Sequence, residues 1–247
     1  MPSSSQLTHL IPQRLHQAPA DPTLAIVFPG QGAQHAGMAA RLYEASPAAR
    51  QLFDEADAVL QTALSRLCFD GPEEALRRTA NAQPAILVTA LAFLAAALER
   101  GDLQRRPAFL AGHSLGEYTA LVAAGALSFA DALPLVRQRG LLMQQAGEGA
   151  MAAVLGLSED MVDEICRLSA AQACNYNAPT QLVVGGPPDA VAAAAALARE
   201  RGAKALPLNV SGAFHTPLMA DAARDFARLV DAVPLRDPVI PVVGNVE

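Results

Sequence analysis

Apolar runs alternate with helix-like segments along the first half of the chain. The pattern predicts short strands at residues 24–28 and 109–112, and helices at 38–60, with a break near Pro47, and at 85–100. The last of these segments is alanine-rich and apolar on every side, which indicates a buried helix. Because strands that alternate with helices form parallel sheets covered by helices, this half predicts an α/β fold.

The pattern changes character at about residue 151. Strands are expected at residues 152–156, 181–184 and 205–210, with helices between them at 158–168 and 188–201. Strand, helix, strand, helix and strand joined by short turns are typical of a compact ferredoxin-like α+β unit.

Three parts of the chain are therefore expected. Residues 1–21 are rich in Ser, Gln and Pro and are predicted to be a flexible extension. Residues 22–149 and 212–247 should form a large α/β subdomain with a hydrolase-like parallel sheet, and residues 150–211 an inserted ferredoxin-like subdomain. A small subdomain inserted into a large one leaves a cleft, where a ligand site is expected.

Composition narrows the possible partners and environment. The 247 residues are 52% hydrophobic, which is enough for a large core, and the formal net charge of −6 argues against a nucleic acid as partner. No apolar run is long enough to cross a membrane without interruption, and the start of the chain does not resemble a secretory signal. The three cysteines lack metal-like spacing, which argues against a metal site or disulfides and favours a cytoplasmic protein.

The pentapeptide at residues 112–116, Gly-His-Ser-Leu-Gly, has the G-x-S-x-G pattern of a nucleophile elbow. It follows an apolar run at 108–111 and precedes a helix-like segment at 117–124, so strand, tight turn and helix come in the required order. Both glycines should be necessary, because a Cβ at either position would collide with the neighbouring strand or helix. Ser114 is the candidate nucleophile, and a serine that only caps a helix is the alternative.

A serine nucleophile needs a base, and His215 is the best candidate. It lies in a loop at residues 211–217, where the small subdomain returns to the large one. The other histidines are less suited: two lie in the extension, one in a Gly-rich loop and one beside the serine but pointing away (His9, His16, His35 and His113). The alternative for His215 is a packed loop histidine without a catalytic role.

An acyl-transfer site also needs donors for the oxyanion. The amide of Leu115, directly after the nucleophile, is the first expected donor, and Gln31 in the Gly-rich loop at 28–34 can supply the second. The same loop fails as a dinucleotide-binding fingerprint, because His35 occupies the third glycine position.

The helix expected at residues 131–146 carries a clue to the substrate. Arg139 falls in the middle of its apolar face, where a guanidinium is costly unless an anion meets it. An internal partner such as Glu117 is one possibility. The other is a substrate carboxylate, which the planar fork of arginine can bind through two hydrogen bonds.

Several motifs together resemble one family, the malonyl-CoA:acyl-carrier-protein transacylases of fatty-acid and polyketide synthesis. The resemblance runs from about Leu24 to the end, in the order and spacing of the family. It rests on Gly30-Gln31-Gly32-Ala33-Gln34, Gln83-Pro84-Ala85, Gly112 to Glu117, Arg139-Gly140, Asn175-Tyr176-Asn177 and Gly212 to Met219.

The resemblance implies a reaction and a role for each site residue. Ser114 would take malonyl from malonyl-CoA as a covalent ester and pass it to the phosphopantetheine thiol of an acyl carrier protein, without a metal or cofactor. The implied roles are base for His215, carboxylate clamp for Arg139, oxyanion donors for Gln31 and Leu115, exclusion of methylmalonyl for Phe214, and polar lining of the cleft for Gln83 and Asn177. The family also implies a monomer.

Two other function classes stay open at this point. A thioester hydrolase could use the same scaffold, although a hydrolase of neutral acyl chains would gain nothing from Arg139. The second class is an impaired fragment that only binds a carrier protein. Members of the family typically continue past residues 244–246 with a segment that orients the histidine. The chain stops at Glu247 on an apolar strand expected at 239–243.

Overall fold

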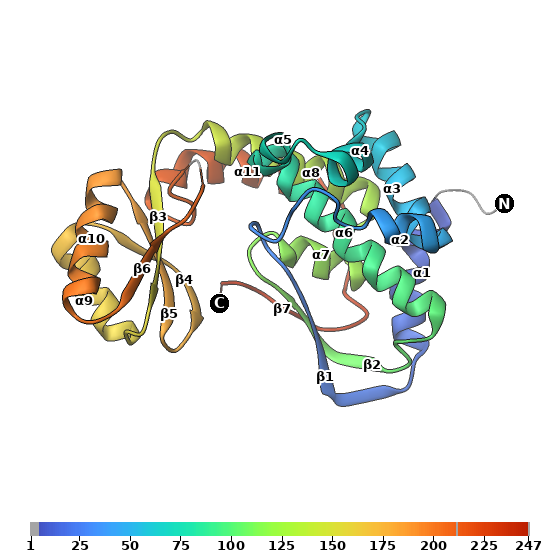
Figure 1. The fold of residues 1–247 in the computed structure, drawn as a ribbon. Helices are drawn as coiled ribbons and strands as arrows, with labels where there is room; N and C mark the ends of the chain where they lie inside the picture. Colours follow the sequence, from blue (N-terminus) through green and yellow to red (C-terminus); the bar gives the residue numbers. More distant parts are fainter. Residues whose placement is uncertain (1–4, 211, 247) are drawn as a thin grey trace. The chain divides into compact units, whose positions relative to one another are not determined.

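The computed structural model describes residues 5–210 and 212–246. They divide into two compact units, Met1–Gly140 with Leu229–Glu247, and Leu141–Arg228 (Figure 1). The boundaries expected at 149/150 and 211/212 both fall inside the second unit. The reason is packing: Met143, Phe214 and Met219 belong to one apolar cluster with side chains of the small sheet, so the flanking segments join that unit.

The first unit has a sheet that is parallel, as the sequence predicted, and whose three strands lie in the order β1-β2-β7. Its strands are β1 (Ala20–Phe28), β2 (Arg106–Gly112) and β7 (Val242–Val243). Its helices are α1 (Ser5–Gln17), α2 (Ala40–Ala45), α3 (Pro47–Leu60), α4 (Leu64–Asp70), α5 (Glu73–Arg77), α6 (Thr79–Arg100) and α7 (Gly116–Ala123). Two further helices cross the unit boundaries, α8 (Phe129–Gln145) and α11 (Ala220–Asp231).

The start of the chain differs from the predicted flexible extension. Helix α1 packs against α3, α6, α7 and β2. Ile11 and Leu15, one helical turn apart, are buried, and β1 already pairs with β2 at Ala20. The polar composition concealed this short apolar stripe. Residues 1–4 of the expected extension lie outside the described residues.

Helix α6 is the core helix that the alanine-rich segment predicted. Its length and apolar composition alone would also allow it to cross a membrane, but 67% of its apolar window is buried inside the protein. Burial within the helical layer is a sufficient reason for that composition. The helix begins at Thr79, six residues before the predicted start, and accommodates Pro84 in its second turn.

The second unit is an antiparallel four-stranded sheet with a ferredoxin-like element order. Its elements are β3 (Ala150–Leu155), α9 (Glu159–Ser169), β4 (Gln172–Ala178), β5 (Gln181–Gly186), α10 (Pro188–Glu200), β6 (Lys204–Pro207) and the short 3-10 helix η1 (Pro217–Met219). The sheet order is β4-β5-β3-β6. Strand β4 was missed by the sequence analysis, because its apolar and polar residues are mixed without a regular alternation over the whole strand. It completes the βαββαβ order of the ferredoxin-like fold.

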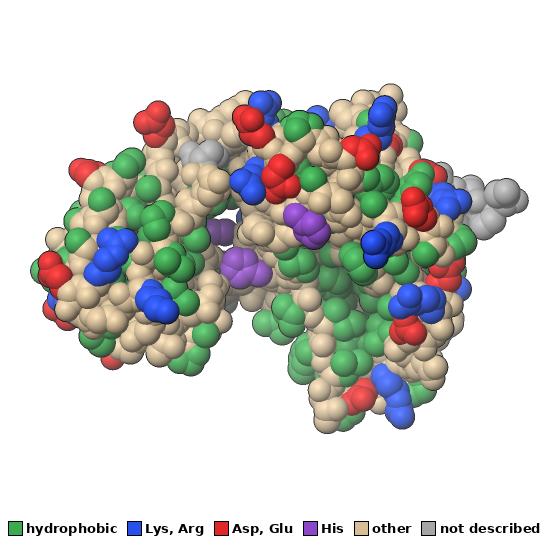
Figure 2. Space-filling model, in the orientation of Figure 1, with side chains coloured by type: hydrophobic (Ala, Val, Ile, Leu, Met, Phe, Trp, Pro, Cys, Tyr) green, Lys and Arg blue, Asp and Glu red, His purple; other side chains and the backbone are tan. Residues whose placement is uncertain are grey.

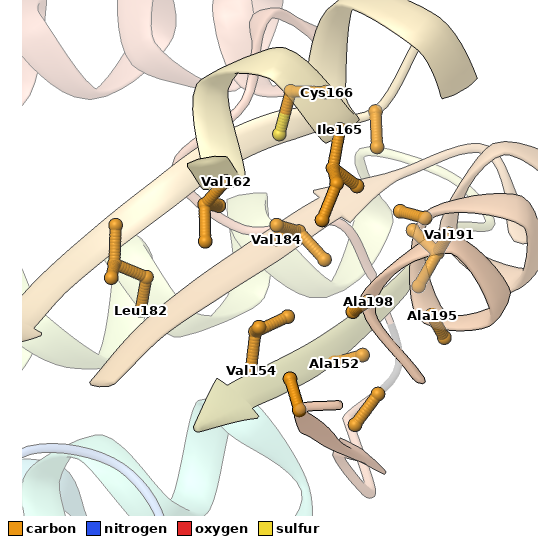
Figure 3. Packing of buried hydrophobic residues seen from close by; sticks show 14 of the residues in the cluster. Ala152, Val154, Val162, Ile165, Cys166, Leu182, Val184, Val191, Ala195 and Ala198 are labelled. Atoms are coloured by element: carbon orange, nitrogen blue, oxygen red, sulfur yellow. The ribbon is translucent and has the colours of Figure 1, made fainter. Parts of the chain in front are cut away.

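The core of the second unit lies between the sheet and its two helices. Figure 3 shows Val154 and Val184, from β3 and β5, directed toward Val162, Ile165 and other apolar side chains of α9 and α10. Alanines fill most of the α10 side, which allows that helix to approach the sheet closely.

Candidate active site

Ser114 lies on a sharp turn between β2 and α7, as the G-x-S-x-G pattern predicted. Its φ is +50°, in the left-handed region. A Cβ added at Gly112 would overlap the backbone of Gly116, and one added at Gly116 would overlap the carbonyl oxygen of Phe28. The prediction that both glycines are required is therefore confirmed.

Left-handed backbone at residues other than glycine also distinguishes His215. Five described residues have it. Gln61 and Ala170 are helix C-caps, where it is common, and Ala39 directly precedes helix α2. The other two are Ser114 and His215, at +50° and +61°. Strained backbone outside helix ends is concentrated at functional sites, which supports both residues as candidates.

Arg139 reaches the nucleophile from α8. Its Nη2 donates to Ser114 Oγ at 3.1 Å and its Nη1 donates to Gln83 Oε1 at 2.9 Å. The guanidinium carbon lies 5.5 Å from the centre of the Tyr118 ring. Gly140 permits this approach, because a Cβ there would lie only 2.6 Å from the carbonyl oxygen of Thr79 at the start of α6.

The environment of Arg139 is suited to an anion. Burial lowers the pKa of its guanidinium, and the nearby Tyr118 and Glu117 oppose that shift. Glu117, the internal partner considered from the sequence, acts only through space, because its carboxylate accepts hydrogen bonds from Asn245. Arg139 donates to the uncharged side chains of Gln83 and Ser114, and it also forms a side-chain hydrogen bond with Tyr118.

The expected oxyanion donors lie at two neighbouring strand ends. Leu115 precedes the first turn of α7, and Gln31 lies in the loop after β1, where its side chain donates to Thr79 Oγ1 at 3.3 Å. The His113 N–H donates to Phe28 O at 3.0 Å and so ties the elbow to the end of β1. This loop and the elbow therefore lie side by side, as two oxyanion donors require.

The remaining predicted site residues belong to the second unit. Phe214 is buried in a small apolar cluster, and Thr216 Oγ1 donates to Ala213 O at 2.7 Å, so both anchor the loop that carries the exposed His215. Asn177 is exposed on β4. The pairing of His215 with Ser114 and the roles of Phe214 and Asn177 stay predictions.

One residue beside the nucleophile was missed by the sequence analysis. The Asn245 Oδ1 accepts from the Ser114 N–H at 2.9 Å, and its Nδ2 donates to Gly112 O at 2.8 Å. The available signal was the apolar strand expected at 239–243, because the carboxyl ends of parallel strands meet at one edge of a sheet.

Charged side chains of both signs are spread over one face of the protein (Figure 2). On the face shown in Figure 2, basic and acidic side chains are interspersed without a continuous basic patch. The formal net charge is −6. Phosphate backbones bind surfaces on which basic residues gather.

Comparisons with known proteins find relatives that are similar to this chain over both of its units. The family of acyl transferase domains matches residues 25–246. The malonyl CoA-acyl carrier protein transacylase of Bacillus subtilis (strain 168) is 49% identical over 232 residues, which are 90% of this chain and 72% of the relative.

Solved structures give the same result. The malonyl-CoA:acyl carrier protein transacylase of Xanthomonas oryzae pv. oryzae superposes with a TM-score of 0.86 at 47% identity, over 92% of this chain and 74% of that one. A malonyl-transacylase in complex with its type II polyketide synthase acyl-carrier protein superposes with a TM-score of 0.86 at 42% identity, over 90% of this chain and 74% of that one. With its elbow, its partly buried arginine and most of both units inside the matched range, the chain belongs to the family of acyl transferase domains.

Proposed function

We propose that this protein transfers a malonyl group from malonyl-CoA to the phosphopantetheine thiol of an acyl carrier protein. The observation that carries the proposal is the pair of hydrogen bonds from Arg139 to Ser114 Oγ and to buried Gln83. It places a positive charge within one hydrogen bond of the nucleophile. An acyl group with a free carboxylate could therefore bind Arg139 while its thioester carbonyl lies against Ser114.

In the first half-reaction, Ser114 Oγ attacks the thioester carbonyl of malonyl-CoA and its proton passes to His215. The amides of Leu115 and Gln31 donate to the oxyanion of the tetrahedral intermediate. The carbon–sulfur bond then breaks, coenzyme A leaves as the thiol with the proton from His215, and malonyl remains as an ester on Ser114.

In the second half-reaction, the carrier-protein thiol gives its proton to His215 and attacks the ester. The Ser114 oxygen leaves and takes the proton back, which regenerates the enzyme. Phe214 is proposed to exclude a branched methylmalonyl unit, and Gln83 and Asn177 are proposed to line the cleft.

The reaction needs no cofactor, because coenzyme A arrives as part of the substrate. A cytoplasmic location fits the free thiols of all three cysteines, because disulfides are rare in that compartment.

The proposal is tested by trapping the acyl-enzyme. The protein is incubated with malonyl-CoA labelled in the malonyl group, quenched in acid, digested, and analysed by mass spectrometry. The expected result is one malonyl ester on the peptide that contains Ser114, absent from the folded Ser114→Ala variant. Failure of the folded wild-type protein to take up label would overturn the proposal.

Addition of a carrier protein separates transfer from hydrolysis. With the phosphopantetheine-bearing form, label should move from Ser114 to the carrier thiol, whereas the form without phosphopantetheine should leave it on the enzyme. Label released mainly as free malonate in both cases would favour the thioester hydrolase instead. Label that stays on Ser114 with either carrier would reject the second half-reaction.

A further inference from the structure

Asn245 lies where the ends of two parallel strands meet. Strand β7 pairs with β2 so that Leu110 faces Val242 and Ala111 faces Val243. The next residues on each strand lead into the elbow on one side and into Gly244 and Asn245 on the other. Residues 131 positions apart in the chain are therefore adjacent in space.

The side-chain amide of Asn245 bridges three parts of the elbow. Its Oδ1 accepts from the Ser114 N–H at 2.9 Å, while its Nδ2 donates to Gly112 O at 2.8 Å and to Glu117 Oε2 at 2.6 Å. The reversed amide orientation would set a donor against the Ser114 N–H and an acceptor against two oxygens. Only the observed orientation therefore satisfies all three groups.

These bonds act on the strained residue itself. Ser114 holds a left-handed φ of +50°, and its neighbour His113 is tied to β1 through the bond from its N–H to Phe28 O. Asn245 ties the turn on the other side, to β7. With both sides held, the serine oxygen keeps one position relative to the oxyanion donor at Leu115.

The same side chain also fixes the nearest carboxylate. Glu117 Oε2 accepts from Asn245 Nδ2 and, at 3.3 Å, from the Asn245 backbone N–H. Glu117 lies in the first turn of α7, where a negative charge interacts favourably with the helix dipole. Held there, its carboxylate makes no ion pair with Arg139 in the described part of the chain, and the guanidinium keeps its capacity for a substrate carboxylate.

We propose that Asn245 is a positioning residue for the acyl-transfer reaction, which holds the nucleophile elbow in its reactive conformation together with Glu117. It does not touch the substrate. The inference rests on the proposed function, but its first consequence is structural: the Ser114 amide should exchange its hydrogen slowly because Asn245 accepts it.

The test compares Asn245→Ala with Val246→Ala, a neighbouring change at a side chain that is 89% exposed. Asn245→Ala should lower kcat for malonyl-Ser114 formation by about 10- to 100-fold, because a small misplacement of a nucleophile has effects of this order. KM should change less than kcat. Hydrogen exchange at the peptide spanning residues 112–117 should become faster in the same variant and stay unchanged in Val246→Ala.

A second, independent test changes the charges at Asn245 and Glu117 one after the other. Asn245→Asp can still accept from the Ser114 N–H, but it places a carboxylate oxygen against both Glu117 and the carbonyl oxygen of Gly112 and should lose activity. Adding Glu117→Gln supplies a donor to that carboxylate and should recover part of kcat. The inference is overturned if Asn245→Ala keeps both the kcat and the exchange rate of Val246→Ala, or if Glu117→Gln gives no recovery. Wild-type protein that forms no acyl-enzyme would instead reject the proposed function, and the exchange measurement would still report on the contact.

Discussion

The two units hold their candidate catalytic residues by different kinds of contact. Around Ser114, the first unit uses directional hydrogen bonds: Arg139 donates to Ser114 Oγ, the Ser114 N–H donates to Asn245, and the neighbouring His113 N–H donates to the end of β1. Around His215, the second unit uses apolar packing: Phe214 is 5% exposed and packs in a cluster with Met151. Thr216 adds one local hydrogen bond to that loop.

The two kinds of contact fix different properties of a side chain. Hydrogen bonds set its orientation, whereas apolar packing sets only its position. Hydrogen bonds constrain direction, so the Ser114 backbone and the Arg139 fork are set within the first unit alone. Apolar burial is non-directional: it fixes the place of Phe214, next to the exposed His215, without fixing the direction of a bond. The first unit should therefore tolerate backbone shifts much less than the second.

Matched glycine substitutions should give the largest difference between the units. In Gly116→Ala the new Cβ overlaps the Phe28 carbonyl oxygen, which is backbone and cannot move alone, so we expect a loss of about 3 kcal/mol of stability and at least about 100-fold in acylation. In Gly185→Ala the nearest atom is Cys174 Sγ at 2.7 Å, a side chain that can rotate, and the expected loss is about 1 kcal/mol.

Urea denaturation and the Ser114 labelling assay measure both variants. The comparison fails if the Gly185 variant loses as much acylation as the Gly116 variant while it stays folded. It also fails if the Gly116 variant is labelled at the wild-type rate.

The next prediction concerns substrate selectivity. We expect Arg139 of the first unit to favour an acyl group with a carboxylate, and Phe214 of the second unit to exclude a methyl branch. Arg139→Ala should lower acylation by malonyl-CoA about 100-fold relative to acetyl-CoA, because loss of a buried charged partner has a cost of roughly 2–5 kcal/mol. Phe214→Ala should leave that ratio unchanged and raise use of methylmalonyl-CoA relative to malonyl-CoA. Initial rates of acylation with the three thioesters measure both ratios.

Arg137→Ala is the matched control for the charge. Arg137 lies on the same helix and donates to Thr62 Oγ1 at 3.1 Å, away from Ser114. An equal change in the malonyl-to-acetyl ratio for Arg137→Ala and Arg139→Ala would contradict a specific carboxylate clamp. A shift of that ratio in Phe214→Ala would contradict the division of selectivity between the units.

Local patterns predicted most of the fold and part of the site. The elbow was found because its chemistry lies within one pentapeptide, and helix α8 was found within two residues of its bounds because its apolar residues recur at helical spacing. The ferredoxin-like unit was identified although β4 was missed, since the other elements keep their order. Each of these features depends on residues close together in sequence.

Features that depend on distant contacts could not be predicted in the same way. Helix α1 looks polar, and its helical structure depends on burying Ile11 and Leu15 against other elements. The contact between Asn245 and Ser114 needs the register of β7 against β2, which no local pattern contains. The unit boundaries shifted for the same reason, because Phe214 packs on the small sheet.

The smallest expected effect concerns Glu55 in α3 of the first unit, whose carboxyl group is partly buried among the helices. Burial raises the pKa of Glu55 in α3 to about 7, and its Oε2 is buried without a hydrogen-bond partner among the described residues. From about pH 4.5 to 7 the folded protein therefore binds a proton that the unfolded chain has lost, so stability falls as pH rises through this range. Glu55→Gln removes this dependence and should be more stabilising at pH 8 than at pH 4.5 by about 1 kcal/mol, since the partly exposed carboxyl is screened by solvent. Urea unfolding at both pH values, with the exposed Glu44→Gln as control, measures the difference; equal shifts at both pH values would show that burial of Glu55 has no cost.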